Sequence, residues 1–84
     1  MAKVTLTAEA ARELETLSNP IHTRMLKLLI RLRQWPQVSG AKPLTAGLSG
    51  SYRLRTGDYR LQIHVSGDIV TVDKIGHRDG FYEE

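Results

Sequence analysis

The sequence predicts an α+β domain in which two N-terminal helices pack on one face of a small, mainly antiparallel, twisted sheet. Two observations lead to this expectation. Apolar residues recur with the period of a helix in the N-terminal half, and they alternate with polar residues, as in strands, from residue 51 onward. The expected element order is β-α-α-β-β-β. Because 84 residues leave room for one hydrophobic core, we expect a single domain spanning residues 1–84.

A short strand and a first helix are expected at the N-terminus. Residues 3–6 alternate polar and apolar, which suits a strand with its two apolar side chains inward. Thr7 follows and offers a hydroxyl to the free amides of a helix start. The apolar stripe of this first helix comprises Ala10, Leu14 and Leu17, and the charged residues between them lie outside it.

The second helix has a clearer period. We expect it to begin at Pro20, with Asn19 as its N-cap, and to end near Gln34 or Trp35, because Pro36 disfavours a helical residue before it. Its buried face comprises Ile21, Met25, Leu28, Leu29 and Leu32. A basic ridge beside that face comprises Arg24, Lys27 and Arg31. The glycine- and proline-containing segment 36–50 is expected to be a loop.

Three strands joined by tight turns are expected after this loop. In the first, Arg53 and Arg55 point away from the helices, because side chains alternate along a strand. In the second, one face carries Tyr59, Leu61, Ile63 and Val65 and the other carries Arg60, Gln62 and His64. In the third, Ile75 breaks the alternation, which predicts either a bulge or the end of the strand near residues 73–74.

Charge is distributed unevenly along the chain. The net charge is only +3, but residues 16–57 contain no Asp or Glu and seven Lys or Arg. Such a stretch attracts nucleic acid or an acidic protein, although a solvated helix face would explain the charge alone equally well. The absence of cysteine excludes disulfides and thiolate metal sites, and no apolar run approaches the roughly 20 residues of a membrane span. We expect a soluble cytoplasmic protein that binds no membrane.

Arginines on the first two of these three strands are expected to meet. If residues 56–58 form a hairpin turn, Arg55 and Arg60 become neighbours, and like charges so placed repel by a few tenths of a kcal/mol or more. A bound anion would explain the pair, since a guanidinium donates two hydrogen bonds to one phosphate. The alternative is the ordinary solvated outer face of an antiparallel sheet.

The segment YRLRTGDYR at residues 52–60, followed by IGHR at residues 75–78 and by Tyr82, resembles the RelE/ParE toxin superfamily. The resemblance covers essentially the whole chain, and its most specific part is the pairing of these two motifs at this separation. It implies a RelE-like fold. RelE-type members are ribosome-dependent mRNA endonucleases neutralised by an antitoxin, so the implied partners are a cognate antitoxin, the ribosome and mRNA.

The resemblance also implies roles for individual residues. Arg60 and Arg78 are expected to grip the scissile phosphate. Arg53 and Arg55 are expected to hold this phosphate and its neighbours. Tyr82 is expected to stack on a base or to help move a proton. No cofactor or metal is expected, because fixed cations stabilise the developing charge and the three scattered histidines form no metal constellation.

Proton transfer is less clearly assigned. Some relatives carry lysines where this chain has Arg53 and Arg55, and an arginine stays protonated and does not serve as a base. His77 is therefore a catalytic candidate, with a structural role as the alternative. His64 shares the face of Arg60 but lies four residues along, roughly 13 Å at the rise of a strand, so we expect it outside the site.

Two other functions stay open. ParE-like members of the superfamily inhibit DNA gyrase by protein contact without being nucleases, and a degenerate toxin would retain only antitoxin binding. Neither needs all four of the arginines at positions 53, 55, 60 and 78, which favours the nuclease. Arginines also bind acidic antitoxins, however, so this preference rests on the cationic set alone.

Overall fold

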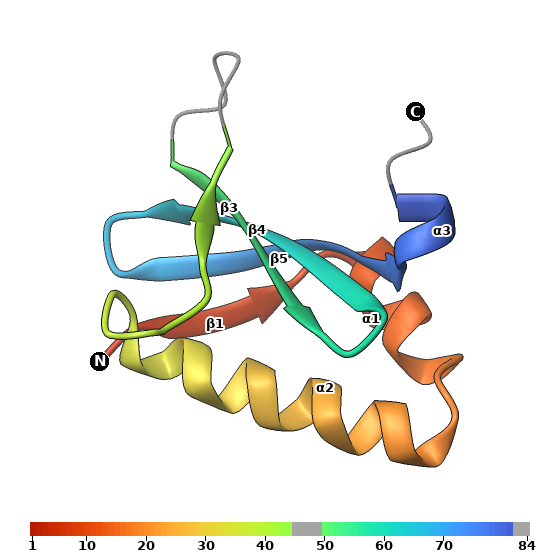
Figure 1. Ribbon diagram of the computed structural model, residues 1–84. Helices are drawn as coiled ribbons and strands as arrows, with labels where there is room; N and C mark the ends of the chain where they lie inside the picture. The colour runs from red at the N-terminus through yellow and green to blue at the C-terminus, as the bar shows by residue number, and fades with distance from the viewer. Residues whose placement is uncertain (45–49, 82–84) are drawn as a thin grey trace.

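The computed structural model describes residues 1–44 and 50–81, and it confirms the α+β class. Within these residues, helices pack against a five-stranded mixed sheet (Figure 1). The elements in chain order are β1 (Lys3–Leu6), α1 (Ala8–Glu15), α2 (Asn19–Arg31), the 3-10 helix η1 (Leu32–Gln34), β2 (Lys42–Pro43), β3 (Ser51–Thr56), β4 (Tyr59–Ser66), β5 (Ile69–His77) and α3 (Arg78–Phe81). None of the described helices is both long enough and apolar enough to cross a membrane.

The sheet has the strand order β1-β5-β4-β3-β2. Neighbouring strands are antiparallel except for β1 and β5, which come from opposite ends of the chain and pair in parallel, with Val4 opposite Val70. The expectation of a mainly antiparallel sheet is therefore confirmed. Two short elements were not expected, namely β2, inside the segment interpreted as a loop, and α3, after the last strand.

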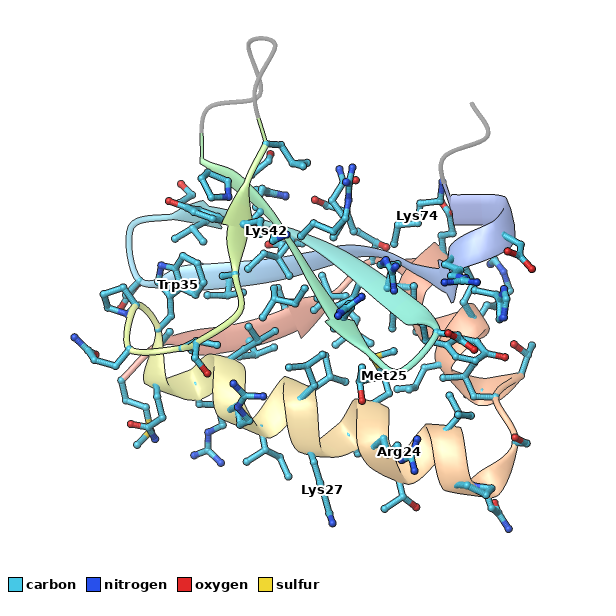
Figure 2. The ribbon with its side chains drawn as sticks, viewed as in Figure 1. Arg24, Met25, Lys27, Trp35, Lys42 and Lys74 are labelled. Atoms are coloured by element: carbon cyan, nitrogen blue, oxygen red, sulfur yellow. The ribbon has the colours of Figure 1, made fainter. Side chains whose placement is uncertain are left out.

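The core lies between the helices and one face of the sheet. Its fully buried residues comprise Ala10, Met25, Leu32, Leu61, Ile63, Val70, Val72 and Ile75. Met25 points from α2 toward the sheet (Figure 2), as the helical period predicts. On β4, Leu61 and Ile63 are buried while Gln62 between them is not, which is the alternation expected of a strand with one covered face.

The helix starts largely follow the sequence signals. The hydroxyl of Thr7 accepts a hydrogen bond from the Ala10 amide at 3.1 Å, which confirms Thr7 as an N-cap. The predicted start of α2, Pro20, is one residue later than the observed start, Asn19. Ser18, rather than Asn19, is the N-cap, because its extended backbone lets its carbonyl accept the first helical bond, from the His22 amide at 2.7 Å.

The bulge on β5 falls where the sequence predicts it. Gln62 lies opposite Lys74, but the next residue, Ile63, lies opposite Val72, so Asp73 has no opposing residue on β4. Such a bulge places one extra residue in a strand and redirects its side chains. The shift explains how Ile75 returns to the buried face although it breaks the period of two.

Hydrogen bonds from the start of α1 hold this bulge. The Thr7 amide donates to the Val72 carbonyl at 3.0 Å, and the Thr7 hydroxyl donates to the Asp73 carbonyl at 3.1 Å. From the other end of α1, a carboxylate oxygen of Glu13 accepts from the Ile75 amide at 2.9 Å. The backbone on both sides of Asp73 is thus fixed by residues far from it in the chain.

Candidate nucleic-acid interface

Arginines gather on the outer face of the sheet, the face turned away from α1 and α2. Arg55 lies directly opposite Arg60 across the β3–β4 hairpin, and Arg53 lies opposite Gln62. Directly opposed residues point to the same side of a sheet, and the buried Leu54 between the two β3 arginines points to the other. The expected meeting of Arg55 and Arg60 is therefore present in the fold. The turn that allows it has Gly57 at a φ of 61°, which favours glycine.

A groove opens where β2 ends. In the described part of the chain, β2 pairs only with Tyr52 and Arg53, so the outer edge of β3 has no neighbouring strand from Leu54 to Thr56. The groove has a volume of about 470 Å³, and the buried residues Leu28 and Leu54 supply its apolar lining. Its cationic lining comes from α2, β2, β3 and β4 and comprises Arg31, Lys42, Arg53, Arg55 and Arg60. None of its described lining residues is acidic, and we call it the basic groove.

Helix α2 contributes more to this surface than the sequence suggested. One guanidinium nitrogen of Arg31 donates to the carbonyl and to the hydroxyl of Ser39, both at 3.1 Å, which holds the side chain beside the groove. A second hollow between α2 and the β3 edge is lined by Arg24, Lys27, Leu28, Arg31, Arg55 and Thr56. Figure 2 shows Arg24 and Lys27 on α2 and Lys42 on β2. The basic ridge and the strand arginines therefore form one continuous cationic surface.

Two like-charge pairs are directly opposed in the groove, Lys42 with Arg53 and Arg55 with Arg60, and the second pair spans the hairpin. The direct opposition of Arg55 and Arg60 costs a few tenths of a kcal/mol or more. Arg60 offsets part of this cost with a long hydrogen bond, 3.4 Å, to the Gly57 carbonyl. An anion between the two guanidinium groups would remove the repulsion and accept several charge-assisted hydrogen bonds. The geometry therefore suits a phosphate.

Arg78 lies at the end of β5, beside the β3–β4 turn. Its amide donates to the Asp58 carbonyl at 2.8 Å, and its Nε is 3.8 Å from a carboxylate oxygen of Asp79. The side chain is 57% exposed and is not among the residues that line the basic groove. The structure thus brings Arg53, Arg55 and Arg60 together in one groove, with Arg78 at the end of the neighbouring strand.

His77 lies on the other side of the sheet. It pairs with Tyr59, and the two rings make an edge contact with centroids 5.1 Å apart. Since Tyr59 precedes Arg60 on β4, the two point to opposite faces. Nδ1 of His77 accepts a hydrogen bond from the Asp79 amide at 3.1 Å at the start of α3. Tyr82, the other expected catalytic residue, lies outside the described residues.

A histidine and a carboxylate also meet on the outer face. Nδ1 of His64 lies 3.0 and 2.9 Å from the two carboxylate oxygens of Asp73. The sequence did not show this contact, because Asp73 reaches His64 only by way of the bulge on β5.

We compared the chain with known protein families, curated proteins and solved structures, and only solved structures are similar to it. No protein-family model and no curated protein matches the sequence. Among solved structures, the RelBE2 toxin–antitoxin complex of Mycobacterium tuberculosis is 28% identical over 92% of this chain and 98% of that chain, with a TM-score of 0.79. The isolated E. coli RelE toxin is 18% identical over 92% and 84% of the two chains, with a TM-score of 0.78. The YoeB–YefM complex of Staphylococcus aureus is 15% identical over 92% and 97%, with a TM-score of 0.72.

The chain has the RelE-like toxin fold. The expected resemblance is therefore confirmed at the level of architecture. Within this RelE-like fold, sequence reasoning missed Arg31 and Lys42 as members of the groove. The acid-free stretch from residue 16 to 57 was the available signal, since it contains both residues together with Arg53 and Arg55.

Proposed function

We propose that this protein is the toxin of a type II toxin–antitoxin system and acts as a ribosome-dependent mRNA endoribonuclease. The observation that carries the proposal is the basic groove, in which five cationic side chains from four elements meet and no described lining residue is acidic. A cationic groove of this kind tracks the phosphates of a single strand. The similarity to RelE and YoeB toxin structures supports the toxin class.

The arginines supply what the chemistry needs without a metal. Cleavage of RNA by its own 2′-hydroxyl builds negative charge on the phosphate oxygens in the transition state. Fixed cations aimed at that charge stabilise it strongly, because they need not reorganise during the reaction. Arg55 and Arg60, opposed across the hairpin, are placed to share the scissile phosphate. Arg53, one alternation further along β3, is placed to hold that phosphate or the next one.

The three remaining candidate residues, Arg78, Tyr82 and His77, have different roles in the proposal. Arg78 extends the cationic surface from the end of β5, where its exposed side chain is free to approach a phosphate bound near the β3–β4 turn. Tyr82 keeps its proposed part in stacking or proton transfer, although it lies outside the described residues. His77 is better suited to structure than to catalysis, because its ring contacts Tyr59 and its Nδ1 bonds the start of α3.

A cognate antitoxin is the proposed protein partner. The similar structures include the RelBE2 toxin–antitoxin complex of Mycobacterium tuberculosis and the intact E. coli RelBE toxin–antitoxin complex. A basic groove able to hold RNA phosphates is also suited to acidic side chains of an inhibitory protein, which would then compete with mRNA for the same cations. Cytoplasmic ribosomes and their mRNA are the proposed target.

The deciding experiment is primer extension on translated mRNA after induction of the toxin. We expect wild type to produce cuts phased with codons, and Arg60→Gln to reduce cleavage by about 100-fold, the scale of removing one transition-state donor. Arg12→Gln is the matched control, because it makes the same charge change at an exposed position of α1 outside the groove. It should leave cleavage unchanged.

A DNA gyrase supercoiling assay run in parallel distinguishes a nuclease from a gyrase inhibitor. Loss of supercoiling without codon-phased cuts would replace the nuclease with a gyrase inhibitor. Undiminished cleavage by Arg60→Gln would show that the groove does not hold the scissile phosphate.

A further inference from the structure

The proposed nuclease lacks a base among its arginines. A guanidinium stays protonated, so it stabilises charge but does not take the proton of a 2′-hydroxyl. His77 points to the opposite face from Arg60 and uses its Nδ1 for the Asp79 amide. A group that can accept a proton must therefore come from elsewhere on the outer face, if it comes from the described residues.

His64 is on that face and is held in one orientation. Both carboxylate oxygens of Asp73 lie within 3.0 Å of its Nδ1. A carboxylate can only accept, so the proton of the imidazole resides on Nδ1 and the lone pair is on Nε2. The imidazole side chain is 48% exposed, against 29% for Asp73. The pair thus presents an exposed imidazole whose tautomer is set by a less exposed carboxylate.

His64 is not among the described residues that line the basic groove, so its distance from a bound phosphate depends on Arg53, which is. Arg53 lies opposite Gln62, which is midway between Arg60 and His64. His64 and Arg53 are therefore diagonal neighbours on one face, with a separation of roughly 7–8 Å, within reach of long side chains. The imidazole can reach the 2′-hydroxyl only if the scissile phosphate is held by Arg53, because Arg60 bonds back toward the turn, to the Gly57 carbonyl.

The bulge explains why the carboxylate is there. Val72 and Ile75 are both buried, and the extra residue between them lets Asp73 and Lys74 both avoid the core. Lys74 lies on the side of the sheet away from α2 (Figure 2). Thr7 and Glu13 hold the backbone around Asp73 with the hydrogen bonds described above. Local structure thus fixes the acceptor that orients His64.

We propose that His64, oriented by Asp73, is the general base of the cleavage, an inference that rests on the proposed nuclease function. Nε2 takes the proton of the attacking 2′-hydroxyl while the O2′–P bond forms. The P–O5′ bond breaks, and the leaving 5′-oxygen takes a proton from water. The products are a 2′,3′-cyclic phosphate and a 5′-hydroxyl. Asp73 stabilises the imidazolium, as a buried aspartate stabilises that of the histidine in serine proteases. The imidazolium then returns its proton to water.

The charged neighbours of His64 come from three strands. On β3, Arg53 is its diagonal neighbour, and Lys42 of β2 lies one strand further out, opposite Arg53. On β5, Asp73 is in direct contact, Thr71 lies directly opposite, and Lys74 lies opposite Gln62. The carboxylate is the only one of these groups that favours an imidazolium, and it is also the closest. A proton gained from the 2′-hydroxyl is therefore received beside a negative charge.

The test measures translation-dependent mRNA cleavage by His64→Gln and wild type at the same series of pH values. Imidazole changes charge between about pH 5 and 8, and a base contributes only when it is neutral. We expect wild type to exceed His64→Gln by about 100-fold near pH 8, and we expect this ratio to fall as the pH is lowered toward 5.5. Using this ratio cancels the pH dependence of the ribosome itself. His22→Gln, in the first turn of α2, is the matched control and should follow wild type at every pH.

Asp73→Asn is the second variant. It keeps the shape of the side chain but removes the negative acceptor, and we expect cleavage to fall by at least about 10-fold near pH 8. If wild type cleaves mRNA but its activity exceeds that of His64→Gln only slightly and by the same factor at every pH, His64 is not the general base. The proposed nuclease function would then still hold. If the wild-type protein cleaves no mRNA, both the nuclease function and the role of His64 as a base are wrong. A folded Asp73→Asn protein with full activity would show that the carboxylate does not orient a base.

Discussion

The two faces of β4 differ in what they contribute to the protein. The inward face carries Leu61 and Ile63, both fully buried against the helices. The outward face carries Arg60, Gln62 and His64, which lie beside a like charge, an arginine and a carboxylate respectively. Because adjacent residues of one strand serve opposite sides, substitutions one position apart should affect different properties. Stability resides on one face, and the proposed chemistry resides on the other.

The sharpest test of this difference is Leu61→Ala on the inward face. Removing a fully buried leucine loses its transfer free energy and leaves a cavity, so the free energy of unfolding should fall by about 2–5 kcal/mol. Denaturant unfolding measures it. Gln62→Ala, one residue away and not buried, is the control, and it should change the free energy by less than about 0.5 kcal/mol. Equal losses would contradict the separation of the faces.

The next effect concerns the bulge that lets β5 serve both faces. Glu13→Ala removes the acceptor of the Ile75 amide, and Ile75 is fully buried. Leaving a buried amide without its partner should cost about 1–3 kcal/mol of unfolding free energy. Glu15→Ala, an exposed glutamate of the same helix, makes the same chemical change and should cost less than about 0.5 kcal/mol. Thermal or denaturant unfolding of both variants measures the two losses of unfolding free energy, and equal losses would contradict the role of Glu13.

Outward arginines should instead govern the salt dependence of RNA binding. Each phosphate contact with a single strand contributes about −0.7 to the slope of log K against log salt concentration. Arg55→Gln should therefore make this slope shallower by about 0.7, measured by the anisotropy of a labelled single-stranded RNA. Arg12→Gln, outside the groove, should leave the slope unaltered. If both variants changed the slope equally, binding would depend on net charge rather than on the groove.

The smallest expected effect has the opposite sign to those on the inward face. Arg55→Gln relieves the repulsion with Arg60, so the unfolding free energy should rise by a few tenths of a kcal/mol at low salt. Adding salt should shrink the difference, because the pair is screened. A variant that is less stable than wild type under these conditions would mean that Arg55 makes net stabilising contacts.

Much of the fold followed from periodicity. The helical stripe of α2 and the alternation on β3 and β4 depend on local geometry, so the buried faces and the opposition of Arg55 and Arg60 were predictable from the sequence. The break at Ile75 predicted either a bulge or a strand end near residues 73–74, and the structure has a bulge there. The helix boundary at Asn19 was wrong by one residue, because the carbonyl of Ser18 starts the hydrogen-bond pattern.

The site was less predictable, because it depends on contacts between distant parts of the chain. Arg31 and Lys42 join the groove only because α2 passes along the edge of β3 and β2 stops after two residues. The pairing of His64 with Asp73 needs both the register of β4 with β5 and the extra residue in β5. Spacing along one strand placed His64 about 13 Å from Arg60. It gave no account of Arg53, which lies between them on the adjacent strand.

The open edge of β3 has a consequence for solubility. Among the described residues, no strand pairs with this edge from Leu54 to Thr56, and unpaired strand edges promote aggregation. Arg53 and Arg55 beside it, with Arg31 and Lys42 nearby, repel the same edge of a second molecule. The repulsion acts over about 10 Å at an ionic strength of 0.1 M and weakens as salt is added. The cations that suit the groove to a phosphate thus also keep copies of the chain apart, and concentrated protein should remain dispersed longest at low salt.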